Sequence, residues 1–268
     1  MPALRTQLSD TDTQSHTESS HGRSDAAQVA HDGLVAVRRV SEALHEIVDG
    51  MNEATMHGAS RLPGWTRGHV VSHLARNADG LLNLLIWART GIEHPMYAST
   101  ADRDADIEEG APRLARVQQE DLRAAQQRFL RAADRLSPSD WSAQVTDRRG
   151  RPIDASLVPW MRLTELLVHQ VDLGVGVDFD RVAELVGAQA EPFLHYVVTR
   201  FDNRADVPAV RLTVSLGDDA SRVWTLGQGD QVSEVHGRVA AAAAWLTGRE
   251  YDGADPLGGD VPRLPAWL

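Results

Sequence analysis

The chain contains no cysteine, and this absence excludes disulfide bonds, thiolate metal ligands and a cysteine nucleophile. Any thiol chemistry therefore needs a thiol that arrives as a second substrate. The chain also lacks a hydrophobic run long enough for a transmembrane helix, and its N-terminus lacks the apolar segment of a secretion signal. We therefore expect a cytoplasmic protein with no membrane partner.

The chain also lacks an excess of basic residues over acidic ones. The formal net charge is −11 and the isoelectric point is near 5.4. Because binding to a phosphate backbone requires a basic surface, we expect no nucleic-acid partner. The 268 residues, 42% of them hydrophobic, suffice for one large domain or two modest ones. Such a composition fits a soluble protein that acts on small molecules.

Residues 1–27 differ in composition from the rest of the chain. They are rich in Ser, Thr, Asp and His and have few large apolar side chains. A segment of this kind buries too little surface to offset the entropy that it loses on ordering. The sequence therefore predicts a flexible polar tail over residues 1–27.

Residues 28–178 are predicted to form a helical domain, because apolar residues recur there at spacings of three and four. The predicted helices cover about 27–55, 67–90, 112–136 and 159–174. Four amphipathic or buried helices of this length predict a bundle. Residues 91–112 are expected to form a long acidic loop, and loops of such length often cover a functional site.

Residues 179–268 have a different pattern and predict a small α+β domain. A helical segment is expected at 181–201, and an alanine-rich helix at 237–246. Between them, alternating apolar residues and Gly/Asp-rich turns predict antiparallel strands at 210–216, 223–226 and 231–235.

The spacing of polar residues within the predicted helices suggests a metal site. Glu165 and His169 lie four residues apart, so they share one face of a helix, and Asp172 follows one turn later. His73 lies on a separate predicted helix. Two imidazoles and one carboxylate from two helices would form a metal site that keeps positions open for water or substrate, as catalytic metal sites do.

Simpler interpretations of the same residues stay open. Glu165 and His169 could form a buried hydrogen-bonded pair without a metal. Asp172 could fix the tautomer of His169 by accepting its other ring N–H, or it could be an ordinary residue at a helix end. His69 could be a fourth ligand, or it could cap or pack the first turn of its helix.

Two segments resemble the mycothiol-dependent maleylpyruvate isomerase family, which belongs to the wider group of DinB-like metal-binding bundles. The first is Trp65-Thr66-Arg67-Gly68-His69-Val70-Val71-Ser72-His73-Leu74-Ala75-Arg76-Asn77-Ala78-Asp79, and the second places Arg162, Glu165, His169, Asp172 and Leu173 at the spacing of the family. The resemblance covers about residue 28 to the C-terminus.

The resemblance implies a DinB-like four-helix bundle over 28–178 and a small α+β domain, similar to sterol carrier protein, over 179–268. It also implies a Zn²⁺ ion held by His73, Glu165 and His169. Mycothiol, a low-molecular-weight thiol, is the implied co-substrate, which is compatible with the lack of cysteine in the chain.

The implied reaction is the isomerisation of maleylpyruvate to fumarylpyruvate in the gentisate pathway of aromatic degradation. Adding a thiolate converts the cis double bond to a single bond, rotation follows, and loss of the thiolate leaves the trans product. A dicarboxylate substrate also needs cationic partners. Arg103 in the 91–112 loop and Arg249 are the candidates in this interpretation, with Asp172 as a further active-site residue.

Other functions remain compatible with the same pattern. The chain could be a mycothiol S-transferase that acts on another electrophile, a metal-dependent hydrolase, or a zinc-stabilised binding or regulatory module without chemistry. Arg103 and Arg249 could equally be solvated surface residues.

Overall fold

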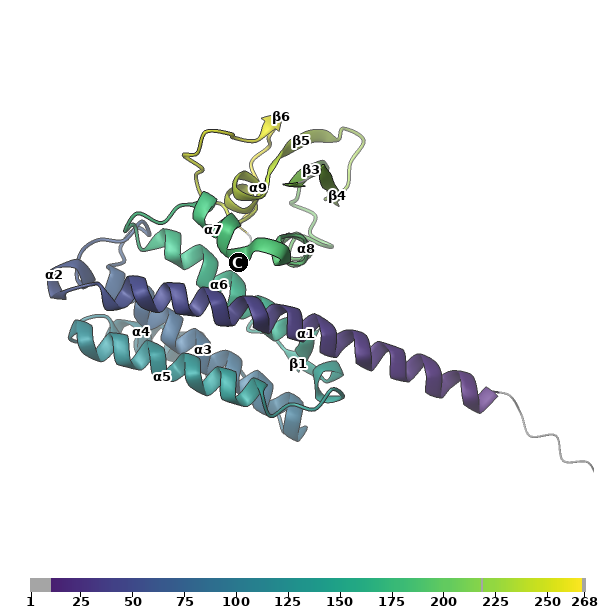
Figure 1. Cartoon of the computed structure of the whole chain (residues 1–268), viewed down its shortest axis with the longest axis horizontal. Coiled ribbons are helices and arrows are strands. Elements are labelled where there is room, and N and C mark those ends of the chain that lie inside the picture. The colour runs from purple at the N-terminus through teal and green to yellow at the C-terminus, as the bar shows by residue number, and fades with distance from the viewer. Residues whose placement is uncertain (1–10, 218, 267–268) are drawn as a thin grey trace, which may run out of the picture.

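The computed structural model describes residues 11–217 and 219–266, with side chains from residue 25 onward, and combines a helical part with a small sheet (Figure 1). The helices are α1 (Thr11–Asp49), α2 (Glu53–Met56), α3 (Arg67–Thr90), α4 (Thr100–Gly110), α5 (Ala115–Ala133), α6 (Val158–Asp172), α7 (Phe179–Val186), α8 (Ala190–Thr199) and α9 (Val239–Leu246). The strands are β1 (Gln144–Thr146), β2 (Pro152–Asp154), β3 (Val210–Gly217), β4 (Ala220–Leu226), β5 (Ser233–Arg238) and β6 (Gly258–Gly259). None of the described helices is both long and apolar enough to cross a membrane.

The helical part is built from α1, α3, α5 and α6, which correspond to the four predicted helices. α1 packs on α6 and α3 packs on α5, and the two pairs share one core (Figure 1). The periodic apolar residues Val37, Val40 and Leu44 of α1 are fully buried, as is Phe129 of α5. Nearly every side chain of α6 is buried, as its apolar composition predicts.

The first helix begins earlier than the sequence predicts. α1 starts at Thr11, within the segment 1–27 that is predicted as a tail; residues 1–10 lie outside the described residues. The prediction rested on the lack of apolar side chains, which governs packing rather than helix formation. The segment from Thr11 contains no proline, and extending a helix that is already nucleated requires only propagation.

Half of the predicted acidic loop at 91–112 is the helix α4, and the prediction is wrong there. The side chain of Ser99 caps α4 by accepting a hydrogen bond from the Asp102 amide at 3.0 Å, and Ile107 is buried beneath the helix. The apolar face of α4 is narrow, with only Ile107 and Gly110 buried, so the sequence carries little helical periodicity there.

Two glycines let the end of α4 lie against the start of α3. A Cβ atom on Gly68 would lie 2.5 Å from the carbonyl oxygen of Ala111, and one on Gly110 would lie 2.4 Å from Oγ of Ser72. Neither distance leaves room for a methyl group. This close approach fixes α4, which carries Arg103, over the N-terminal half of α3.

We expect Gly68→Ala to destabilise the protein, although alanine normally stabilises a helix interior by roughly 0.5–1 kcal/mol relative to glycine. The added methyl group must displace the Ala111 carbonyl, so the free energy of unfolding should fall by about 1–3 kcal/mol. Urea unfolding measures the change. Gly50→Ala is the control, because its Cβ would make only ordinary contacts at 3.5 Å. Stability of Gly68→Ala at or above that of the wild type would contradict the close packing.

The sheet has the order β4-β3-β5-β6. β3 pairs with β4 in antiparallel fashion, as predicted, but β3 and β5 are parallel, so the prediction of wholly antiparallel strands is wrong. The reason is topological: β4 occupies one edge of β3, and the chain then crosses to the other edge, where it runs in the direction of β3. Both edges of β3, which buries Val210, Leu212 and Val214, are thereby paired.

The sheet part contacts the helical part through α7 and α8. α9 packs on β3, β5 and α7, while α8 packs on α6 (Figure 1). A two-stranded hairpin of β1 and β2, which sequence analysis did not predict, lies between α5 and α6 in the chain. These arrangements bring α8, the hairpin turn and the end of α9 toward the polar residues of α6.

Candidate metal centre

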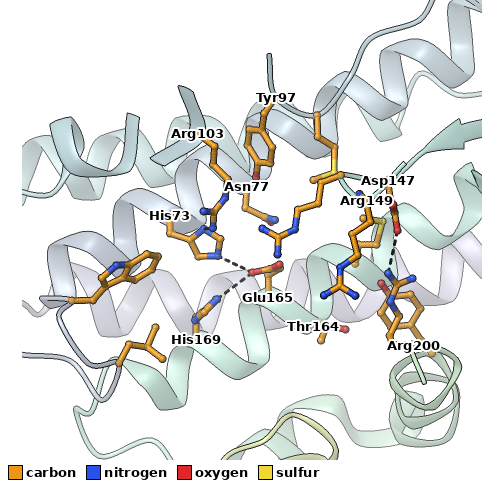
Figure 2. Close-up of a pocket in the computed structure, with 16 residues that line it drawn as sticks. His73, Asn77, Tyr97, Arg103, Asp147, Arg149, Thr164, Glu165, His169 and Arg200 are labelled. Carbon is orange, nitrogen blue, oxygen red and sulfur yellow. Dashed lines mark hydrogen bonds and ion pairs between the residues drawn. The ribbon is translucent and has the colours of Figure 1, made fainter. Parts of the chain in front are cut away.

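Three side chains from two helices converge on one point. His73 comes from α3, and Glu165 and His169 come from α6; their possible ligand atoms all lie within 4.8 Å of one another. Oε2 of Glu165 lies 2.8 Å from Nε2 of His73 and 3.2 Å from Nε2 of His169 (Figure 2). The structure therefore brings together the three residues that were predicted as metal ligands, and this donor set could hold a metal ion.

The charges of this cluster follow from its burial and its partners. Burial lowers the pKa of His73 to about 4, although Glu165 opposes the shift. Burial would raise the pKa of Glu165, but His73 and His169 outweigh it and hold the value well below its usual range. Glu165 is therefore an anion and His73 a neutral imidazole near pH 7, which are the protonation states that metal ligation requires.

His169 is held by a chain of two further residues. Its Nδ1 lies 2.8 Å from Oδ2 of Asp172, and the guanidinium of Arg249 binds the same carboxylate through Nε at 3.2 Å and Nη2 at 2.8 Å. Burial alone would lower the pKa of His169, but its hydrogen bonds to Asp172 and Glu165 raise it above the usual value. Asp172 therefore contacts Nδ1 of His169, which is one of the two roles that the sequence left open for Asp172.

Arg249 does not appear among the residues that line the cavity beside the cluster. Besides Asp172, its guanidinium donates to the backbone oxygen of Thr247 at 2.6 Å. Arg103, in contrast, lines that cavity; its Nη2 lies 3.2 Å from Nδ1 of His73 and its guanidinium lies 5.9 Å from the ring centre of Tyr97. The two arginines therefore reach the cluster differently, one through Asp172 and one from the cavity side.

His69 is a capping residue in the structure. Its Nδ1 accepts a hydrogen bond from the Thr66 amide at 3.1 Å, while Oγ1 of Thr66 faces the His69 amide, so the pair forms a capping box at the start of α3. Its Nε2 lies 3.4 Å from the exposed Glu108. The group of possible metal ligands accordingly contains His73 but not His69.

Arg162 fixes the spacing between the two helices that carry the cluster. It is fully buried on α6 and binds the Leu74 carbonyl and Oδ1 of Asn77 on α3, both at 2.8 Å, together with Gln126 at 2.9 Å. Burial lowers the pKa of its guanidinium to about 10. The arginine lies one turn before Glu165, so its bonds to α3 hold Glu165 within reach of His73.

A cavity of about 190 Å³ opens beside the cluster (Figure 2). Its walls combine apolar side chains, among them Trp65 and Met161, with several arginines. The sequence did not predict three further residues of this wall, Arg148, Arg149 and Arg200. A signal for two of them exists in the run Arg148-Arg149-Gly150-Arg151, because a glycine among arginines marks a turn that presents basic side chains.

Comparisons with known proteins identify the family. Residues 37–174 match the family model described as the mycothiol maleylpyruvate isomerase N-terminal domain, which spans half of the chain. The chain belongs to the mycothiol maleylpyruvate isomerase family. This confirms the resemblance drawn from the two sequence segments.

Two solved structures are similar over nearly the whole molecule. One is a mycothiol-dependent maleylpyruvate isomerase, and the other is a histidine-to-alanine mutant of a mycothiol-dependent maleylpyruvate isomerase. Each is 26% identical to this chain, and each alignment covers 90% of this chain and 97% of the solved chain. The TM-score is 0.75 for the isomerase and 0.74 for the mutant. The search of curated proteins finds no match.

The bond between His169 and Asp172 predicts a pH dependence of stability in the metal-free protein. His169 has a raised pKa, so its contribution is complete below its ordinary value of 6.5 and is lost as the pH rises through the raised value. Asp172 has a lowered pKa, so its contribution is present above its ordinary value of 3.8. The bond should therefore stabilise the fold most between these two values.

Asp172→Asn tests this expectation. In chelator-treated protein, it should reduce the free energy of unfolding by about 1–3 kcal/mol more at about pH 5.5 than at about pH 9. Urea unfolding at the two pH values measures the difference. Glu184→Gln, which removes an exposed partner of Arg181, is the control and should show no such dependence. An equal loss for Asp172→Asn at both pH values would show that His169 is not stabilised as a cation.

Proposed function

We propose that this protein catalyses the zinc- and mycothiol-dependent cis-trans isomerisation of maleylpyruvate to fumarylpyruvate. The observation that carries the proposal is the convergence of His73, Glu165 and His169 beside a cavity lined with arginines. Membership in the mycothiol maleylpyruvate isomerase family and similarity to a solved mycothiol-dependent maleylpyruvate isomerase support the choice of thiol and substrate. We also propose the domain division of a DinB-like four-helix bundle over 28–178 and a sterol-carrier-like domain over 179–268.

The three side chains fit a zinc ion in number and chemistry. Two imidazoles and one carboxylate are a common catalytic ligand set, and their ligand atoms lie close enough to share one ion. Asp172 occupies Nδ1 of His169, so the Nε2 lone pair faces the other two ligands. Zinc bound there would lower the pKa of a thiol and stabilise negative charge that develops on the substrate.

Ligation through Nε2 of His73 would change the role of Arg103. With the Nε2 lone pair engaged, the ring proton lies on Nδ1, which then cannot accept the hydrogen bond from Nη2 of Arg103. The guanidinium would therefore turn away from His73. Nη1 of Arg103 donates to Asp104 at 2.6 Å, but Nη2 would then be available in the cavity to bind a carboxylate of the substrate.

The reaction itself needs no net proton transfer. The mycothiol thiolate forms a C–S bond at one carbon of the cis double bond, and the electron pair of that bond moves to the conjugated carbonyl oxygen. The former double bond rotates, the electron pair returns, and the C–S bond breaks to give the trans isomer and the thiolate. The protein must therefore bind two reactants, stabilise one negative charge and keep water away from the reacting atoms. The apolar side chains of Trp65 and Met161 in the cavity wall would exclude water.

The proposal is tested by an assay with purified protein, maleylpyruvate and mycothiol. We expect fumarylpyruvate to form only when the thiol is present, and we expect a chelator to abolish the reaction and added Zn²⁺ to restore it. His169→Gln should lose the activity, whereas His69→Gln should retain most of it, because His69 caps α3 and is not part of the group of possible metal ligands. No isomerisation by metal-loaded wild-type protein would refute the proposal, and consumption of mycothiol into a stable adduct would point to an S-transferase.

Arg249 provides a second prediction, because its bonds to Asp172 suggest a positioning role rather than contact with the substrate. Arg249→Gln should lower kcat by about 10- to 100-fold, since it loosens the residue that orients His169, with little change in KM for maleylpyruvate. Arg249→Lys keeps the charge but loses the two-point contact with Asp172, so its kcat should lie between those of the wild type and Arg249→Gln. A rise in KM with unchanged kcat would instead support the direct contact with a substrate carboxylate that the sequence predicts.

A further inference from the structure

The charge of the cavity wall is opposite to that of the whole chain. The protein has 38 acidic and 27 basic residues, yet the cavity lining contains four arginines and only two carboxylates, Asp147 and Glu165. Three of these arginines come from outside α3, α4 and α6: Arg148 and Arg149 lie in the β1–β2 turn, and Arg200 lies directly after α8. We call them the distal arginine group.

The β1–β2 turn is built to hold this group in place. The buried carboxylate of Asp147 accepts hydrogen bonds from the backbone amides of Arg149 at 2.9 Å and Arg151 at 3.1 Å. Gly150 follows with a φ of +77°, which closes the turn. Asp147 also binds Nη2 of Arg200 at 3.2 Å and therefore joins the turn to α8. One side chain thus fixes the positions of both halves of the group.

The distal arginine group has more donors than the described protein satisfies. Among the described residues, no hydrogen bond or ion pair reaches the guanidinium of Arg148 or Arg149, and the buried Nε of Arg200 has no partner. Figure 2 shows Arg149 extending between Glu165 and Arg200 above Thr164. Burial and the like charges of Arg151 and Arg148 lower the pKa of Arg149. Asp147 is the nearby carboxylate, and it is already shared by Arg151 and Arg200.

We propose that the distal arginine group binds one terminal carboxylate of the electrophile, so that the cavity selects a dicarboxylate. The carboxylate would accept hydrogen bonds from the guanidinium groups of Arg149 and Arg200, which both line the cavity, while the reactive double bond lies toward Glu165 and the histidines. Guanidinium groups suit this task because they bind a carboxylate through two parallel hydrogen bonds. The placement of the double bond rests on the proposed function; the carboxylate site itself does not.

The size of the cavity agrees with a short substrate. Its volume of about 190 Å³ is smaller than the roughly 300–1,000 Å³ of pockets that hold drug-sized ligands. A short chain with a charge at each end would place one carboxylate at the distal arginine group and leave the other within reach of Arg103. A ligand with one carboxylate would leave one of these two cationic ends of the cavity without an anion, which is the basis of the selectivity.

Binding of an unreactive substrate mimic tests the site without thiol and without turnover. Pimelate is a saturated dicarboxylate of the same chain length as maleylpyruvate, and heptanoate has the same chain with one carboxylate. Isothermal titration of metal-loaded wild-type protein should show pimelate binding about tenfold or more tightly than heptanoate. Arg149→Gln should weaken pimelate binding by about tenfold or more, and Arg148→Gln tests the same group at a second position.

Arg181→Gln is the matched control, because Arg181 is exposed on α7 and its side chain pairs with Glu184 on the protein surface; it should bind pimelate as the wild type does. Both cavity variants should fold, since neither side chain has a partner that is left unpaired. Equal affinity of wild type, Arg149→Gln and Arg148→Gln for pimelate would overturn the proposal, as would heptanoate or inorganic phosphate binding as tightly as pimelate.

The outcome separates this site from the proposed function. If isomerisation fails but Arg149→Gln loses pimelate affinity, the distal arginine group serves another dicarboxylate. If isomerisation succeeds and both cavity variants retain pimelate affinity and kcat/KM for maleylpyruvate, the reaction stands and the carboxylate site is refuted.

Discussion

The arrangement of the site depends on one buried carboxylate that two helices share. Glu165 contacts His73 of α3 and His169 of α6 through the same oxygen. A carboxylate in such a place is costly unless it has cationic or hydrogen-bonding partners. The neighbouring Arg162, which binds the backbone and Asn77 of α3, sets the distance between the helices. The packing of α3 on α6 and the geometry of the candidate metal centre therefore depend on the same contacts.

The other parts of the site come from segments spread along the chain. α4 supplies Arg103, the β1–β2 turn and the residue after α8 supply the distal arginine group, and the segment after α9 supplies Arg249. Arg249 contacts Asp172, which in turn contacts His169. An acidic protein thus surrounds one anionic ligand set with arginines, which suits a reaction in which negative charge enters and develops.

The sequence predicts the cluster of His73, Glu165 and His169 because helical periodicity and family resemblance agree there. The four long helices also follow from the spacing of apolar residues. Helix α4 was missed because it buries few side chains, and the start of α1 was misplaced because helix extension does not require burial. The distal arginine group could not be placed, since its position depends on a turn and on α8, which only tertiary packing brings together.

Metal content tests the central claim most directly, which is that Glu165 and the two histidines form a zinc site. Inductively coupled plasma mass spectrometry of purified wild-type protein should find about one zinc per chain. Glu165→Gln keeps the size of the side chain but removes its charge. His73→Asn replaces the imidazole with an amide and so removes the Nε2 ligand atom. Both variants should lose the metal while remaining folded. Full zinc content in both variants, or a folded wild-type protein that binds no divalent metal, would contradict the account.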